Sequence, residues 1–177
     1  TMGEMQVPAD ALYGASTQRA VLNFPVSGRP VPAAIITAYA QLKAACAMVN
    51  KNLKRLDKGR ADAINAACGQ IKDGLTDFGG IARHFPVDIY QTGSGTSTNM
   101  NANEVIANLV CIAKGKPIGL SKDPEFIKAG GVHPNDHVNM GQSSNDTFPT
   151  AMHIAAAVAI KNDLLPAVQR MAKKLEA

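Results

Sequence analysis

The chain has 177 residues, of which 46% are hydrophobic, 18% charged and 5% aromatic, and its formal net charge is +4. The basic residues are scattered and tryptophan is absent, which argues against a nucleic-acid site, because such a site needs a basic stripe with stacking side chains. We find no apolar stretch that would cross a bilayer and no secretory leader at Thr1. The three cysteines are widely spaced, which suits a reduced compartment. We therefore expect a cytoplasmic protein without a membrane partner.

Residues 1–30 are predicted to form extended segments and turns, because prolines and glycines interrupt every apolar piece. Two helices should follow, over residues 33–56 and 60–78, where apolar side chains recur at helical spacing. We interpret both helices as packing elements and assign them no site.

A strongly polar segment runs from Thr92 to Asn103 and offers five hydroxyls and three side-chain amides. An apolar stripe begins near Thr98 and ends at Gly115-Lys116-Pro117, so this segment should lead into a helix with its donors at the N-terminus. Residues 115–131 then return to an irregular path.

A second polar segment, from Gln142 to Thr150, also leads into a helix. Neither polar segment contains Lys or Arg, so an anion would be held by neutral donors and helix N-termini rather than by side-chain charge. Each segment alone could be a Ser/Thr/Asn turn with an ordinary helix cap. Two such segments together favour an anion site.

The strongest helical pattern follows Asp146. A coiled-coil-like seam is formed by apolar residues that step by four, three and four positions, namely Leu164, Val168, Met171 and Leu175. About thirty helical residues would extend roughly 45 Å, too long to bury in a domain of this size, so we expect partner helices. Pro166 is placed to kink the helix. We therefore place an amino-terminal domain at residues 1–139 and the start of a helical bundle domain at 140–177.

Three motifs occur in the order found in one enzyme family: the run from Thr92 to Ala107, the tetrapeptide His133-Pro134-Asn135-Asp136, and the run from Ser143 to Thr150. Together with the opening from Val7 to Ala20, they closely resemble class II fumarases of the fumarase/aspartase superfamily. The resemblance implies a mainly α fold, in which an amino-terminal helical domain with a short irregular start precedes the first long helix of a central bundle. Family members are more than twice as long, so we expect an amino-terminal fragment without the family's catalytic histidine segment and its Gly-Ser-Ser loop.

The activity implied by the resemblance is reversible hydration of fumarate to (S)-malate in the tricarboxylic acid cycle, without a metal or an organic cofactor. Removing a proton beside a carboxylate creates a carbanion, so fixed donors must be aimed at the carboxylate oxygens. By similarity, one part of the dicarboxylate would be bound by Ser94, Gly95 and Thr96. The other part, and the water, would be positioned by Ser143, Ser144 and Asn145. The general base would come from the missing portion and from neighbouring subunits of a homotetramer, so we expect no catalytic residue in this chain and no activity from it alone.

By the same resemblance, His133, Asn135 and Asp136 match a second, non-catalytic anion site near the active-site entrance. Gly130 stands where some members carry an arginine, and Asn135 or Asp136 could instead cap a short helix. His133 lies four residues before another histidine, but the glutamate of the zinc-protease pattern and a third ligand are missing, so we predict no metal site.

Two alternatives stay open. The pair Ser143-Ser144 favours a fumarase, whereas His137 is more familiar from the aspartase branch, so an aspartate ammonia-lyase is the first alternative. The second is a non-catalytic oligomerisation or scaffold piece that kept the fold. A scaffold would need the helical seam but not the hydroxyls and amides of the two polar segments.

Overall fold

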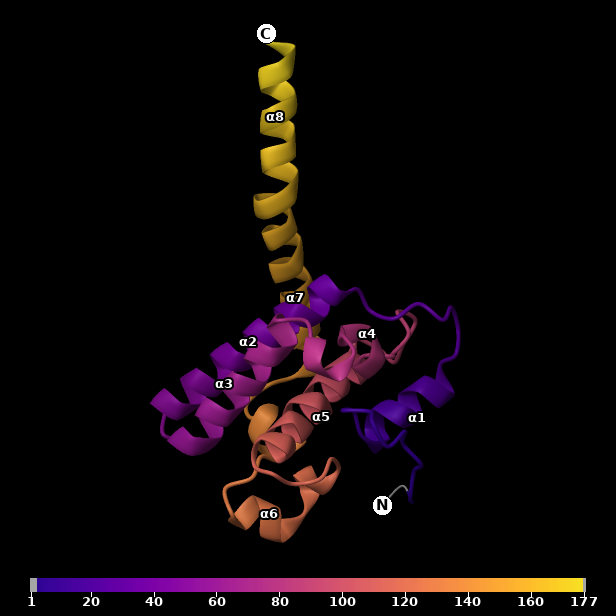
Figure 1. Cartoon of the computed structure of the whole chain (residues 1–177), viewed down its shortest axis with the longest axis vertical. Coiled ribbons are helices and arrows are strands. Elements are labelled where there is room, and N and C mark those ends of the chain that lie inside the picture. The colour runs from indigo at the N-terminus through magenta and orange to yellow at the C-terminus, as the bar shows by residue number, and fades with distance from the viewer. Residues whose placement is uncertain (1–2, 177) are drawn as a thin grey trace.

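A computed structural model of the chain describes residues 3–176, which fold into helices joined by turns (Figure 1). The α-helices are α1 (Ala15–Asn23), α2 (Ala33–Asn52), α3 (Lys58–Lys72), α4 (Ile81–His84), α5 (Thr96–Ala113), α6 (Pro124–Lys128), α7 (Ser144–Ala159) and α8 (Leu165–Leu175). The short 3₁₀ and π segments are η1 (Thr76–Phe78), η2 (Leu120–Lys122), η3 (Pro134–Val138) and η4 (Ile160–Leu164). Pairing of extended backbone in the described residues is limited to one bridge between Pro30 and Asp88. The predicted mainly α fold class is confirmed.

The core forms where α2 and α3 pack side by side and α5 lies against both of them (Figure 1). Its almost completely buried side chains include Ile36, Tyr39, Ile64, Val105 and Ile106. The two helices predicted over 33–56 and 60–78 are therefore present, but both end earlier. Lys54 and Leu75 take left-handed backbone conformations, with φ of 59° and 53°, and these turns end the helical paths.

Helix α1 was not predicted, because the segment that contains it has no local capping signal. Gly14 precedes the helix and contributes no capping side chain. The cap comes instead from Glu104 of α5, whose carboxylate accepts hydrogen bonds from the backbone N–H groups of Gly14, Ser16 and Thr17 at 2.9, 3.0 and 3.1 Å. A carboxylate at a helix N-terminus satisfies its free donors and its positive dipole end. The prediction of an irregular start was thus wrong for residues 15–23.

Helix α5 is the central element, and nearly all of it from Ser97 to Cys111 is buried. It ends in the predicted way: Gly115 has φ of 68°, and the N–H groups of Gly115 and Lys116 donate to the carbonyls of Ile112 and Cys111, both at 2.9 Å. This is the Schellman arrangement, which favours glycine. The irregular stretch that follows carries η2 and α6 at the lower end of the molecule (Figure 1).

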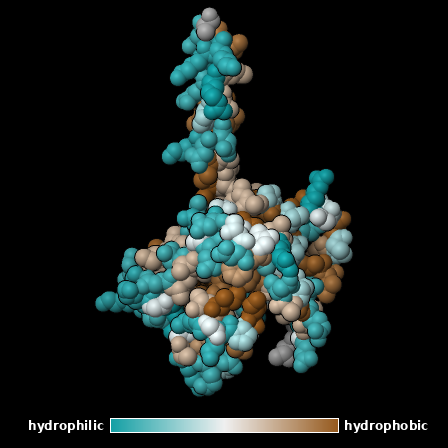
Figure 2. Space-filling model, viewed as in Figure 1, coloured by the Kyte–Doolittle hydropathy of each residue, from teal (hydrophilic) through white to brown (hydrophobic). Residues whose placement is uncertain are grey.

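Helices α7 and α8 form one continuous helix of 32 residues, Ser144–Leu175, which projects well beyond the remaining helices (Figure 1). The predicted seam is solvent-exposed, with 54% exposure for Leu164 and 60% for Met171, and Figure 2 shows hydrophobic side chains along the projecting part. Pro166 lies in the first turn of α8, directly after the π segment η4. Because proline cannot donate to the preceding turn, a local change of helical pitch accommodates it, and the expected kink stays a prediction.

By length and composition this 32-residue helix could cross a membrane, with a mean hydropathy of 1.2 over its most apolar window. The sequence-based statement that no such stretch exists is therefore corrected. The start of α7 belongs to the body of the molecule, because Thr147, Ala151 and Ala155 are buried against α2 and α5. The domain boundary proposed between residues 139 and 140 stays a prediction.

The three cysteines are free thiols, with Cys46 half-buried and Cys68 and Cys111 buried. Burial raises the pKa of Cys68 to about 12 and that of Cys111 to about 11. A buried thiol that stays protonated is a poor nucleophile.

Candidate active site

The two polar segments meet in space, although they lie far apart in the sequence. Thr96 is the first residue of α5 and Ser144 the first of α7, and their hydroxyl oxygens are 3.0 Å apart within a hydrogen bond. Both helices therefore begin at the same place, with hydroxyl side chains at their N-termini. Free N–H groups and the positive end of the helix dipole make such a place suitable for an anion.

Gly95 and Phe148 interlock the two segments. Gly95 caps α5 in a left-handed conformation, with φ of 74°, and a Cβ atom at this position would lie 2.1 Å from the ring of Phe148. Only glycine satisfies both the backbone conformation and the close approach. The ring of Phe148 also packs 6.2 Å from that of Tyr39, so it fixes the start of α7 against α5 and α2.

The other predicted substrate-binding residues surround this contact. Ser94 and Asn145 are exposed, one on each segment. Ser143 is the N-cap of α7, and its hydroxyl accepts a hydrogen bond from the N–H of Asn145 at 3.3 Å. Ser143 therefore has the ordinary capping role that was considered as the plain alternative, and its exposed hydroxyl keeps further hydrogen-bonding capacity. The assignment of these residues to a substrate stays a prediction.

A buried cation next to the two polar segments was missed. Lys43 of α2 is completely buried, and its ammonium donates to Asn99 of α5 and to Gln142, which directly precedes the second segment, at 2.7 and 2.8 Å. The sequence predicted no site on this helix and an anion site held by neutral donors, because neither polar segment contains Lys or Arg. A signal was available, because Lys43 lies four residues after buried Tyr39 and four before buried Ala47, on the apolar face of the helix.

The predicted second anion site contains residues that bond to one another. The Nδ1 atom of His133 accepts from the N–H of Asp136 at 3.1 Å, so His133, rather than Asn135 or Asp136, caps the short segment η3. The carboxylate of Asp136 also lies 3.1 Å from this nitrogen. His137 accepts from the N–H of His133 at 2.8 Å, and burial, followed by the charge of Arg60, lowers the pKa of His137. Asn135 is exposed. An anion at this place stays a prediction.

Arg60 reaches the same region from α3. Its guanidinium donates to the carbonyls of Gly131 at 2.8 Å and Ile127 at 2.6 Å, and to the carboxylate of Asp57 at 2.6 Å. It is therefore committed to holding the turn before His133 rather than standing free for a ligand. Among residues 3–176 no group of three His, Cys, Asp or Glu side chains could hold a metal ion.

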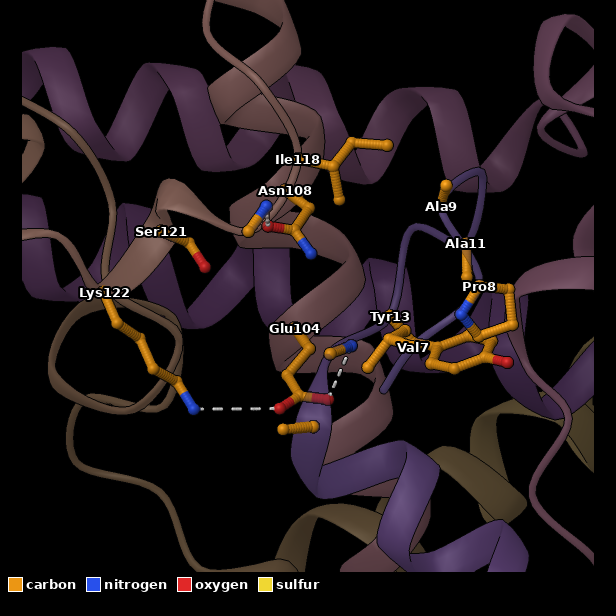
Figure 3. A pocket seen from close by; sticks show the side chains of 13 residues that line it. Val7, Pro8, Ala9, Ala11, Tyr13, Glu104, Asn108, Ile118, Ser121 and Lys122 are labelled. Atoms are coloured by element: carbon orange, nitrogen blue, oxygen red, sulfur yellow. Dashed lines mark hydrogen bonds and ion pairs between the residues drawn. The ribbon is translucent and has the colours of Figure 1, made fainter. Parts of the chain in front are cut away.

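A cavity of about 310 Å³ lies between the N-terminal segment, α5 and residues 118–122 (Figure 3). The buried carboxylate of Glu104 points to its floor, where Thr17 donates a further hydrogen bond at 2.7 Å and the ammonium of Lys122 lies 3.8 Å away. None of the predicted substrate-binding residues lines this cavity. Glu104, which had been given no role, serves as the cap of α1.

Comparison with known proteins identifies relatives over the whole chain. The sequence pattern of a family described as "Lyase" matches residues 3–177. Fumarate hydratase class II of Corynebacterium glutamicum is 53% identical over 177 residues, which cover 99% of this chain and 33% of the relative. The protein of the same description from Mycobacterium tuberculosis is 52% identical, covering 100% of this chain and 33% of the relative. The chain thus spans about a third of the length of these curated relatives.

Solved structures have the same fold. A class II fumarase from Schistosoma mansoni matches with a TM-score of 0.81 and 38% identity, over 96% of this chain and 33% of that one. A protein described as fumarate lyase:delta crystallin, from Brucella melitensis, matches with a TM-score of 0.79 and 42% identity, over 91% and 34% of the two chains. On the family pattern, the shared fold and the identity of about half of all residues, this chain belongs to the lyase family of the class II fumarate hydratases.

Proposed function

We propose that this chain supplies part of the substrate site of a fumarate hydratase, which adds water reversibly across the double bond of fumarate to give (S)-malate in the tricarboxylic acid cycle. The observation that carries the proposal is the 3.0 Å contact between the hydroxyls of Thr96 and Ser144. It brings together two helix N-termini and two hydroxyl-rich segments that lack cations of their own. The similarity to proteins described as class II fumarate hydratases supports the choice of substrate.

The chemistry explains why neutral donors suit this reaction. Removal of the proton beside a carboxylate places negative charge on that carboxylate, and donors fixed in advance stabilise it more than mobile water does. In the proposal, Ser94, Gly95 and Thr96 bind one part of the dicarboxylate. Ser144 and its neighbours Ser143 and Asn145 bind the other part and orient the water. Hydroxyl and amide side chains can bind and release the product without a change of their own charge.

The general base and the remaining charged groups would come from sequence outside this chain and from neighbouring subunits. The exposed seam on η4 and α8 supports assembly into a homotetramer through a helical bundle, since an apolar face of this length is stable only when covered. We propose a cytoplasmic location and no metal or organic cofactor for the reaction.

The test uses the full-length protein and follows fumarate by NMR, with and without a high concentration of ammonium. Malate in both conditions supports the proposal. Replacement of the two donors, as Thr96→Ala and Asn145→Ala, should each lower kcat/KM by about a hundredfold, since loss of a fixed donor typically costs that much. Thr76→Ala, at an exposed threonine of η1, is the matched control and should leave turnover unchanged.

Other outcomes select the alternatives. Aspartate that forms only when ammonium is present would assign the protein to the aspartase branch. If a folded tetramer forms no product from fumarate under either condition, the scaffold hypothesis would replace the enzyme hypothesis. Unchanged turnover in both Thr96→Ala and Asn145→Ala would show that the site assignment is wrong.

A further inference from the structure

Lys43 has an unusual environment for a lysine. It lies in the middle of α2, its side chain is completely buried, and its ammonium donates to three side-chain amide oxygens: Asn99 Oδ1 at 2.7 Å, Gln142 Oε1 at 2.8 Å and Asn139 Oδ1 at 3.0 Å. An ammonium has three N–H donors and no acceptor, so the three oxygens match its full capacity. A neutral amine has only two N–H donors, so deprotonation would remove one of these three hydrogen bonds.

The three acceptors come from the elements that carry the proposed substrate-binding residues. Asn99 lies one helical turn after Thr96 on α5, and Gln142 directly precedes the cap of α7. Asn139 links them, because its Oδ1 also accepts from Asn99 at 3.1 Å and its Nδ2 donates to the carbonyl of Gln142 at 3.1 Å. Lys43 is therefore the common point at which the starts of α5 and α7 are tied to α2.

The network continues into α7 itself. The hydroxyl of Thr147, three residues after Ser144, donates to Asn99 Oδ1 at 3.4 Å and contacts the hydroxyl of Tyr39 at 3.3 Å. Thr147 and Tyr39 are both buried. Movement of the Lys43 ammonium would thus disturb both helix starts, and with them the contact between Thr96 and Ser144.

The positive charge of Lys43 has no acidic partner. Among residues 3–176 no carboxylate forms an ion pair with its Nζ atom. Burial of a charge without a counter-charge is expensive, and a purely structural network could be built from neutral side chains. A buried cation that organises two donor-rich helix starts is, however, suited to an anionic ligand that arrives between them, because its field adds to the helix dipoles.

We propose that Lys43 is a positioning residue of the dicarboxylate site: its ammonium, through Asn99, Asn139 and Gln142, holds the two polar segments in the arrangement that binds substrate. The proposal rests on the proposed function, since it assigns Lys43 to the same site. Lys43 acts through these amides and does not itself touch the substrate.

The protonation state of Lys43 provides a readout. Burial lowers its pKa to about 7, opposed by the nearby thiols of Cys46 on α2 and Cys68 on α3. Two other titratable groups lie around it. The ring centre of Tyr39 is 5.9 Å from Nζ, and burial, followed by the charge of Asp146 at the start of α7, raises the pKa of Cys46. Helix α5 and the turn at 139–142 face Lys43 with the neutral amides of Asn99, Asn139 and Gln142. Loss of the proton removes one donor, so the substrate site should loosen as the pH rises through this pKa.

The experiment compares variants of the full-length protein, after tetramer formation has been checked by sedimentation. Lys43→Met keeps the length of the side chain but removes all three donors, and it should raise the KM for fumarate at least tenfold. It should also abolish the rise of KM above pH 7 that the proposal predicts for the wild type. Lys43→Arg keeps a charge that does not titrate, so it should remove the same pH dependence with a smaller increase in KM. Lys51→Met, on the same helix and paired with Asp62 at 3.4 Å, is the control and should behave as wild type.

A second variant keeps the proposal testable if Lys43→Met fails to assemble. Gln142→Glu replaces an amide oxygen by a carboxylate next to the ammonium, which raises the pKa of Lys43 and should move the rise of KM to higher pH by a unit or more. A wild-type KM and pH profile in folded Lys43→Met, or an unshifted profile in Gln142→Glu, would overturn the proposal while the proposed function stands. If the wild type neither turns over fumarate nor binds it in calorimetry, the proposed function fails, and this role of Lys43 fails with it.

Discussion

Replacement of Gly95 should separate the cost of an unfavourable backbone from the cost of a lost close contact. Gly95 has φ of 74°, which costs a residue with a Cβ about 1 kcal/mol. The added Cβ would also lie 2.1 Å from two ring carbons of Phe148, where no real contact can exist, so the ring or the start of α7 must move. Overpacking of this kind typically costs about 1–3 kcal/mol. Gly95→Ala should therefore destabilise the protein by about 2–4 kcal/mol.

Gly93 provides the matched control, because it shares the left-handed conformation but not the contact. Its φ is 50°, and a Cβ there would meet no atom within 4 Å. Gly93→Ala should cost only the backbone term of about 1 kcal/mol. Both variants are compared with wild type by urea unfolding of the full-length protein, followed by circular dichroism.

A double-mutant cycle isolates the contact between position 95 and the ring of Phe148. In a Phe148→Ala background the ring is gone, so Gly95→Ala should cost no more than Gly93→Ala does. The reasoning is refuted if Gly95→Ala and Gly93→Ala are equally destabilising in the wild-type background. Equal costs would mean that α7 does not start against Gly95.

Three further predictions concern the cap, the buried lysine and the seam. Glu104→Gln should lower the free energy of unfolding by about 2–4 kcal/mol, because an amide cannot accept all four hydrogen bonds at the start of α1. The control Glu125→Gln, at an exposed i,i+3 pair with Lys128, should change it by less than about 0.5 kcal/mol. Equal shifts of the two variants in thermal unfolding would contradict the capping role. Burial lowers the pKa of Lys43 from its ordinary value of 10.5, which applies to the unfolded chain, to about 7 in the folded protein. The unfolded state therefore binds more protons between these pH values, and the free energy of unfolding must rise with pH. From pH 7 to 8.5, the free energy of unfolding from urea titrations should rise more in wild type than in Lys43→Met, by at most about 1.4 kcal/mol per pH unit. Parallel curves for the two proteins would argue against a neutral Lys43 in the folded state. Leu164→Asp and Met171→Asp should each dissociate the proposed tetramer in sedimentation experiments. Asn162→Asp, on the opposite side of the helix, is the control and should not. An intact tetramer in all three variants would exclude this seam as the interface.

Local sequence rules were sufficient wherever an element's own residues decide its conformation. The end of α5 is one case, because the glycine at position 115 and the apolar run before it act within a single turn. The seam of η4 and α8 is another, since four residues on one helix face define it without reference to the remaining chain. Thr96 and Ser144 were assigned to one site only by the resemblance to the fumarase family; their mutual hydrogen bond was not predicted.

Tertiary structure alone decided the features whose partners are distant. Helix α1 exists because Glu104, almost ninety residues later in the chain, occupies its N-terminus, so no window of local sequence contains the cause. In the local sequence, Lys43 is one polar residue in a mainly apolar helix. Its ammonium is satisfied by amides 56 and 99 positions away, and only the packing of α2 against the starts of α5 and α7 brings them within hydrogen-bonding distance. Buried polar groups require partners but place no limit on sequence separation. The sequence by itself therefore determined the apolar helices and the glycine stop of α5, whereas the packing decided that α1 forms and which polar groups meet at the site.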